Sequence, residues 1–299
     1  MIRGFSTRTR FGGSGADAKS SVSIEALDLT LPSGRLRAHA FGDPTKPLVL
    51  CLPGISSTSR TFDRIGEALG GKDARVVALD LRGRGLSDVT PPGTYGWLHH
   101  AQDVLAAANA LGAATFDVIG HSMGAYVALQ AAHLAPARIR RLVLIDGLGI
   151  PRYSAFRLIL RGLERLDRSY ATADAYVEAV RALEIVVPWN DYWERAFRYD
   201  LIEVDGRVSP RTSSRAVFED IAYGAWHDPR RLWHDVEMPV LVLRAAVPLA
   251  APDGFILTDF DTERFVHLTP STRAKDIQAN HLGIVMHPDT AEAISDFVR

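Results

Sequence analysis

Short apolar runs alternate with helix-length segments along most of this chain of 299 residues, and this alternation limits the folds open to it. Runs of four or five apolar residues are typical of strands buried on both faces. The runs lie at residues 48–52, 76–80, 116–119, 142–145 and 240–243, and the helical segments at Thr61–Leu69, Leu98–Leu111, Ala125–Leu134 and Thr290–Val298. Repeated units of this kind predict an α/β fold with a mostly parallel sheet. Ahead of them, Val22–Leu31 and Arg35–Phe41 flank a Pro-Ser-Gly turn and predict a hairpin.

A long interruption separates the strand that ends near Asp146 from the strand that begins at Pro239. About ninety residues lie between them, whereas a connection between elements has a median of ~4–6 residues. Helical patterns fill this stretch at Ala155–Leu166, Ala173–Ala182 and Ser214–Tyr223, with five aromatic residues clustered between them. We therefore expect a helical lid over residues 148–234, inserted into a core of residues 21–147 and 235–299. Residues 1–20 are rich in Ser, Gly and Arg and are expected to be a flexible arm.

The balance of charges limits the kinds of partner that this chain is expected to attract. Thirty-four basic residues against 35 acidic ones give a net charge of −1, which offers no broad electrostatic attraction to nucleic acid or to an anionic membrane. A neutral or weakly charged small molecule is the expected substrate, and a homodimer remains open.

Cys51 lies within an apolar run, where a thiol packs as a small hydrophobe. No run reaches the ~18 residues of a membrane span and no secretory signal is found, so a cytoplasmic location is expected.

The sharpest motif is Gly-x-Ser-x-Gly at residues 120–124, between the strand-like Val118-Ile119 and a helix of small and apolar residues. A turn this tight strains the backbone of the serine, and the two glycines leave room for the neighbouring chain. Such a turn lifts the hydroxyl above the edge of the sheet. Ser122 is therefore predicted to be a nucleophile, which requires a base within hydrogen-bond reach.

An oxyanion formed by attack of Ser122 would need two preorganised N–H donors. The backbone N–H of Met123, directly after the nucleophile, is the first candidate. The second is expected in the loop Leu52-Pro-Gly-Ile-Ser56, from the N–H of Ile55. The alternative interpretation of Pro53-Gly54 is an ordinary turn.

Four segments together resemble the lid-bearing α/β-hydrolase superfamily, in particular its serine esterases and lactonases, across residues 22–299. These segments are Leu52-Pro-Gly-Ile55, the stretch Ala78–Ser87 with its Asp-Leu-Arg-Gly-Arg-Gly core, Gly120–Gly124, and His281 followed by Pro288. The resemblance implies an eight-stranded, mostly parallel sheet flanked by helices. It also implies the chain order serine, acid, histidine, which singles out His281, after the last strand, among ten histidines. His121 is expected to point away from the cleft, and His287 to be a surface or capping residue.

Two departures from the family pattern affect the predicted site. Pro53 replaces the histidine that most relatives have before the oxyanion glycine. The acid usually follows the seventh strand, but residues 241–251 contain no carboxylate. Asp146, at the end of the sixth strand, is the preferred partner of His281, as in some members of the superfamily. Asp253 is the alternative, and a simple turn-capping role for Asp146 also remains open.

The resemblance implies hydrolysis of a small, apolar carboxylic ester or lactone through an acyl-enzyme on Ser122, with no metal and no cofactor. Two other functions remain open. One is C–C bond hydrolysis, or another reaction of a cofactor-free lid enzyme, because a fold does not determine a function. The other is a ligand-binding or signalling protein with little turnover.

Overall fold

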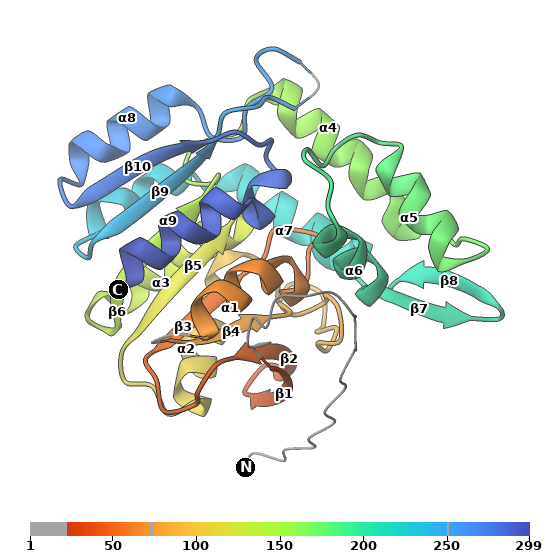
Figure 1. Ribbon diagram of the computed structural model, residues 1–299, viewed down its shortest axis with the longest axis horizontal. Coiled ribbons are helices and arrows are strands. Elements are labelled where there is room, and N and C mark those ends of the chain that lie inside the picture. The colour runs from red at the N-terminus through yellow and green to blue at the C-terminus, as the bar shows by residue number, and fades with distance from the viewer. Residues whose placement is uncertain (1–22, 72–73, 250) are drawn as a thin grey trace, which may run out of the picture.

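An eight-stranded sheet forms the centre of the protein (Figure 1). The computed structural model describes residues 23–71, 74–249 and 251–299, so the expected arm at residues 1–20 lies outside the described part. The strand order is β1-β2-β4-β3-β5-β6-β9-β10. The strands are β1 (Ile24–Leu31), β2 (Gly34–Phe41), β3 (Leu48–Leu52), β4 (Arg75–Leu79), β5 (Phe116–His121), β6 (Ile139–Ile145), β9 (Val240–Ala245) and β10 (Thr272–Ile277).

The pairing of these strands confirms the predicted fold class. β1 and β2 form the expected antiparallel hairpin, and β2 also pairs antiparallel with β4. Every other neighbouring pair, from β4–β3 to β9–β10, is parallel. β10 is an edge strand whose residues are mostly exposed, and it therefore lacks the apolar run that revealed the central strands.

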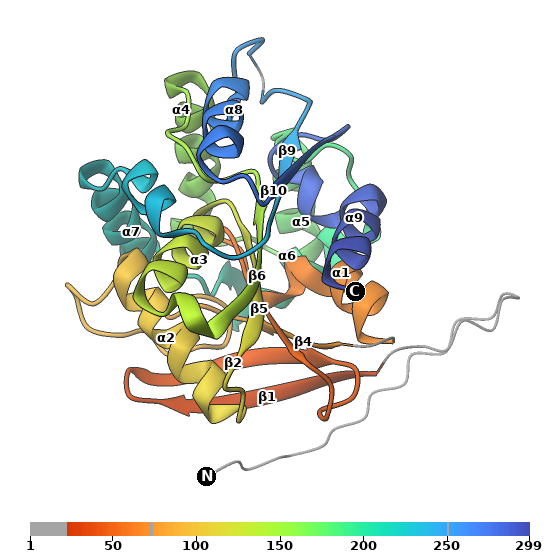
Figure 2. The same cartoon turned by 90° about the vertical axis from the view of Figure 1, so that its left-hand side faces the viewer.

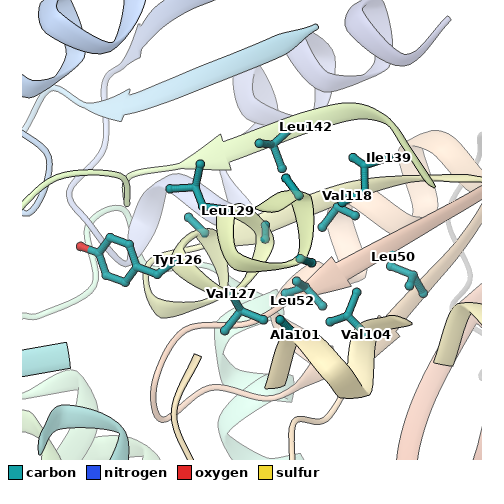
Figure 3. Packing of buried hydrophobic residues seen from close by; sticks show 14 of the residues in the cluster. Leu50, Leu52, Ala101, Val104, Val118, Tyr126, Val127, Leu129, Ile139 and Leu142 are labelled. Carbon is teal, nitrogen blue, oxygen red and sulfur yellow. The ribbon is translucent and has the colours of Figure 1, made fainter. Parts of the chain in front are cut away.

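Helices cover both faces of the sheet (Figure 2). Along β3, Leu50 and Leu52 point to the face covered by α2 (Trp97–Ala110) and α3 (Met123–Leu134), while Val49 and Cys51 point to the opposite face. That opposite face is covered by α1 (Asp63–Gly70) and α9 (Pro288–Val298). Figure 3 shows the first layer, in which side chains of α2, α3 and the central strands pack together. Burial on both faces explains why these strands read as unbroken apolar runs.

The segment between β6 and β9 forms a separate group of helices beside the core (Figure 1). Its helices are α4 (Tyr153–Leu163), α5 (Ala173–Arg181), α6 (Asp191–Tyr199) and α7 (Ser214–Trp226). This stretch was expected to be helical, and it also contains two short strands. Strands β7 (Leu201–Val204) and β8 (Arg207–Pro210) form a hairpin joined by Asp205-Gly206, both at positive φ. Asp-Gly is a preferred pair in two-residue hairpin turns, so this dipeptide was the available signal. The remaining helix, α8 (Asp259–Leu268), connects β9 to β10.

A buried ion cluster joins α7 to the core. Asp220 of α7 pairs with the guanidinium of Arg84, and its carboxylate lies 3.1 Å from Nε2 of His100. It also accepts the backbone N–H of Gly96 at 2.6 Å. Burial opposes ionisation of Asp220, but His100 and Arg84 outweigh it and hold the pKa of this carboxyl below its usual range. The cluster thus fixes one side of the inserted segment to the loop that follows β4.

Replacing Asp220 by asparagine is expected to lower the free energy of unfolding by about 3–5 kcal/mol, because Arg84 would remain buried without its counter-charge. The measurement is urea unfolding, with the midpoint compared at an unchanged m-value. Asp174→Asn is the matched control, since its pair with Arg198 is exposed and should contribute only ~0–1 kcal/mol. Equal stability losses in the two variants would contradict the structural role of the cluster.

Candidate active site

Ser122 lies in a strained turn between β5 and α3. Its φ is 56° and its ψ −121°, a combination that side-chain-bearing residues rarely adopt. The start of the turn is tied to β6 by a hydrogen bond from the Ser122 N–H to the carbonyl of Ile145, at 2.9 Å. The flanking glycines are sterically required, because a Cβ on Gly120 would lie 2.2 Å from the Gly124 oxygen and one on Gly124 2.0 Å from the Leu52 oxygen. The two glycines therefore make the strained turn possible, and the turn places the Ser122 side chain at the cavity above it.

His281 and Asp146 complete a hydrogen-bonded chain with Ser122. Nε2 of His281 lies 2.9 Å from Oγ of Ser122, and Nδ1 lies 2.7 Å from Oδ2 of Asp146. The His281 and Asp146 side chains are 3% and 2% exposed, so little water competes for the bond between them. If Nδ1 donates to the carboxylate, Nε2 is left as an acceptor for the serine proton.

The backbone around Asp146 holds its carboxylate in place. Its second oxygen, Oδ1, accepts the N–H of Ala245 at 2.9 Å, and its own N–H donates to Leu243 at 2.8 Å. Asp146 also has a positive φ of 46°, at the point where the chain leaves β6. Asp253, the alternative acid, is exposed in the loop after β9 and makes no contact with His281 in the part of the chain that the structure describes. The geometry thus selects Asp146 as the partner of His281.

His121, next to Ser122, belongs to the residues around the cavity and is fully buried. Nε2 of its ring donates to the carbonyl of His281 at 2.8 Å. Burial, with the nearby His281 adding to it, lowers the pKa of His121 to about 3, so the ring is neutral near pH 7. A neutral ring can hold the loop of His281 without placing a positive charge beside it. His287, by contrast, caps α9 as expected, accepting the N–H of Asp289 at 3.2 Å.

The loop after β3 passes close to Ser122. A Cβ on Gly54 would lie 3.3 Å from the Ser122 Cβ, so glycine lets the loop approach the nucleophile. Two arginines hold the loop by its carbonyls. Nε of Arg84 donates to Ile55 at 3.0 Å and Nη2 of Arg165 donates to Ser56 at 3.3 Å. Neither the N–H of Ile55 nor that of Met123 donates to an acceptor among the described residues. Both sequence-predicted oxyanion donors are therefore unpaired, and Met123 stands at the N-terminus of α3, where a negative charge is favoured.

The cavity above Ser122 is walled by both parts of the chain. The core contributes residues 54–57, His121, Ser122, Leu249 and residues 281–282, and the inserted segment contributes Leu158, Ile159, Gly162, Leu163, Arg165, Ile185, Trp193 and Phe197. Of the aromatic residues clustered in the insertion, Trp193 and Phe197 face this cavity. The others serve packing or anchoring contacts. Trp189 stacks on Phe197, and the Tyr199 hydroxyl donates to Asp80.

Asn280 ties the loop of His281 to the inserted segment. Its side-chain Oδ1 accepts the N–H of Val187 at 3.0 Å, its Nδ2 donates to Ile185 at 3.0 Å, and its own N–H donates to Val187 at 2.9 Å. Gly283, two residues after the histidine, allows the close approach, since a Cβ there would lie 1.9 Å from the Val187 oxygen. The position of His281 is thus linked to the position of residues 185–187.

Asp200, at the end of α6, is expected to make stability depend on pH. Burial raises the pKa of this carboxyl to about 7, and hydrogen bonding from Thr212 and the charge of Arg165 oppose the shift only in part. The pKa of Asp200 is thus higher in the folded protein than the unfolded value of ~3.9. The protonated carboxyl contributes its full stabilisation below pH ~3.9, and this stabilisation is lost as the pH rises through about 7. Relative to Asp200→Asn, wild type should therefore lose about 1.4 kcal/mol per pH unit between pH 4 and 7. Urea unfolding of both proteins at pH 5, 6, 7 and 8 measures this difference, and parallel pH profiles would refute it.

Across residues 23–71, 74–249 and 251–299, no group of three or more His, Cys, Asp and Glu side chains is placed to hold a metal ion. Nor is any helix in those ranges long and apolar enough to cross a bilayer. Sequence reasoning did not single out Arg165, which lines the cavity, or Asp220, which anchors α7 to the loop after β4. Only their location in space distinguishes them.

Comparison with known proteins identifies similar hydrolases. A family model described as the alpha/beta hydrolase fold matches residues 47–288. The serine hydrolase-like protein of Danio rerio is 37% identical over 252 residues, which cover 76% of this chain and 74% of that relative. The 3-hydroxybutyrate-oligomer hydrolase of Cupriavidus necator is 31% identical over 237 residues, covering 72% and 78%. The crystal structure of E-2-(acetamidomethylene)succinate hydrolase has the same fold, with a TM-score of 0.80 at 24% identity over 92% of this chain and 99% of that one.

Proposed function

The chain belongs to the α/β-hydrolase family, and from this premise we propose that it is a serine hydrolase that cleaves small carboxylic esters or lactones through an acyl-enzyme on Ser122. The observation that carries the proposal is the unbroken chain from Asp146 through His281 to the Ser122 hydroxyl, inside a cavity. This arrangement has the parts that a serine needs to act as a nucleophile near neutral pH.

The proposed reaction begins with attack of Ser122 Oγ on the ester carbonyl while His281 Nε2 takes the serine proton. The carbonyl oxygen becomes an oxyanion and accepts hydrogen bonds from the N–H groups of Ile55 and Met123. His281 then protonates the departing alcohol, and the acyl group remains on Ser122. A water molecule attacks this acyl-enzyme while His281 takes its proton, and His281 then returns the proton to Ser122 Oγ as the acid leaves. Asp146 fixes the tautomer of His281 and stabilises the imidazolium in both steps.

The walls of the cavity support a small substrate with apolar parts. Leu158, Ile159, Trp193 and Phe197 give the inserted segment an apolar surface above the serine. We infer that residues 148–234 act as the lid of the cavity, since they cover Ser122 while the core supplies the proposed catalytic residues. One relative is named for oligomers of 3-hydroxybutyrate, and joining such hydroxy acids head to tail makes ester bonds. An ester-bond substrate for this chain agrees with that relative.

Covalent labelling tests the proposal directly. An alkyl fluorophosphonate should lose fluoride and add one phosphonyl group per chain, observed by intact mass spectrometry, with the adduct mapped to the peptide that contains Ser122. Ser122→Ala is the control and should remain unlabelled. Hydrolysis of short p-nitrophenyl esters and of γ- and δ-lactones by the same preparation would then separate ester from lactone preference. Absence of labelling, together with tight ligand binding and no turnover, would instead support a ligand-binding protein.

A further inference from the structure

Arg165 is a buried cation in the wall of the cavity that holds Ser122. It belongs to the 3₁₀ helix Glu164–Asp167, which follows α4, and is 7% exposed. A guanidinium remains protonated at any pH at which the protein is folded. A positive charge is thus fixed beside an otherwise apolar substrate cavity, and burial of such a charge is costly unless something pairs with it.

The contacts of Arg165 are all with neutral groups. Nε donates to the Tyr176 hydroxyl at 3.2 Å and Nη1 to the Gly162 carbonyl at 2.7 Å. Nη2 donates to the Ser56 carbonyl at 3.3 Å and to the Ser56 hydroxyl at 3.2 Å, both longer than the usual ~2.9 Å. The ring of Phe197 lies 5.8 Å from the guanidinium carbon. These contacts orient the side chain but do not neutralise its charge.

The other buried arginines provide the contrast. Three arginines are buried in the described part of the chain: Arg82, Arg84 and Arg165. Arg82 pairs with Asp103, and Arg84 pairs with Asp220. Among the same described residues, no carboxylate lies within 4.0 Å of the nitrogens of Arg165. Of the three, Arg165 is therefore the one without a paired carboxylate among the described residues. It is also the one that lines the cavity above Ser122.

Asp200 does not supply the missing charge. Its carboxyl interacts electrostatically with Arg165 but does not form an ion pair with it, and it accepts a hydrogen bond from Thr212 Oγ1 at 3.0 Å. Because burial raises the pKa of Asp200 to about 7, a large share of this carboxyl is protonated near neutral pH. Asp200 therefore does not give Arg165 the direct ion pair that Asp103 gives Arg82 and Asp220 gives Arg84.

We propose that Arg165 binds an ionised carboxylate of the substrate, so that the preferred esters are half-esters of dicarboxylic acids or other esters bearing a second, free carboxyl group. The inference rests on the proposed function, since it names the substrate class of the Ser122 site. A carboxylate could accept hydrogen bonds from Nη2 in place of the long Ser56 contacts. The net charge of the whole chain suggested a neutral or weakly charged substrate. The local charge of Arg165, which lines the cavity, favours an anionic substrate instead.

The test compares esters that differ only in charge. Monomethyl esters of succinate, glutarate and adipate are each paired with the methyl alkanoate in which a methyl group replaces the free carboxylate. Hydrolysis is followed in a pH-stat at pH 7.5. In wild type, kcat/KM for at least one charged ester should exceed that of its neutral partner by about tenfold or more. Arg165→Met should lower this charged-to-neutral ratio by about 10–100-fold, and Arg165→Lys, which keeps the charge but not the fork, by less.

The ratio separates binding from a merely structural effect. Loss of the Ser56 contacts could slow both esters equally by loosening the loop after β3, but it would leave their ratio unchanged. Arg168→Met is the matched control, because Arg168 is an exposed arginine of the same segment, paired with Glu164, and its replacement should not alter the ratio. A ratio at or below one in wild type overturns the inference even if Arg165→Met does not fold.

A second readout needs no turnover. Hexanoate should slow fluorophosphonate labelling of Ser122 in wild type at a lower concentration than hexanamide does, and this difference should shrink in Arg165→Met. Equal protection by the acid and the amide overturns the inference, while labelling of Ser122 in the absence of competitor still supports the proposed function. Failure of Ser122 to label at all counts against the proposed function instead.

Discussion

Ser122→Ala is expected to lower kcat for a p-nitrophenyl ester by up to about 10⁶-fold, leaving only the rate that binding and the oxyanion donors supply. The reason is geometric, because Ser122 Oγ is the one hydroxyl bonded to Nε2 of His281 among the described residues. Steady-state kinetics under substrate saturation measure the effect. His281→Ala should give a loss of similar size, since serine and base act as a unit.

The fold should survive the Ser122 substitution. Alanine removes one oxygen and keeps the Cβ that already occupies the strained turn, so urea unfolding should shift little. A stable Ser122→Ala protein with undiminished ester turnover would remove the nucleophile assignment. A stable protein with residual turnover and unchanged KM is the expected outcome.

Asp146→Asn is expected to lower kcat by about 10⁴-fold, the second largest effect. The amide can still accept the N–H of Ala245 through its oxygen, so the local backbone should remain in place. Its NH₂ group would then face Nδ1 of His281 as a donor, which favours the tautomer with the proton on Nε2. His281 could no longer accept the proton of Ser122 in that tautomer. The pH dependence of kcat, measured for wild type and variant, reports the change in the base.

Asp253→Asn is the control for Asp146→Asn. Both changes replace a carboxylate by an amide in a loop that follows a strand, but Asp253 is exposed and distant from the hydrogen bonds of His281. Near-wild-type turnover is expected. A larger loss in Asp253→Asn than in Asp146→Asn would mean that a different conformation of the loop after β9 is the active one.

The parts of the fold that could be predicted are those whose own short sequence shows how they are buried or turned. The central strands are buried on both faces, so they stand out as apolar runs, and the turn at Ser122 carries its own glycines. Asp146 could be inferred because it directly follows the end of β6. In each case one short segment contains both the residue and the reason for its position.

The parts that were missed depend on contacts between distant segments. β10 is exposed and polar, so its strand character comes from pairing with β9. His121 is held by a hydrogen bond to a carbonyl 160 positions away along the chain. Arg165 is one basic residue among many in sequence, and its burial beside Ser56 appears only in the folded protein. No local pattern encodes such partners.

The hydrogen bonds of Asn280 also bear on how a substrate reaches the serine. Residues 185–187 are bonded to the residue just before His281, so lifting this part of the insertion would pull the imidazole away from Ser122. On the opposite side, Asp220 is held to Arg84, whose Nε supports the Ile55 carbonyl. An opening at either anchor would move residues that we propose as the base or as oxyanion donors. A conformation that keeps Ser122, His281 and the Ile55 loop in the positions described above therefore keeps both anchors closed.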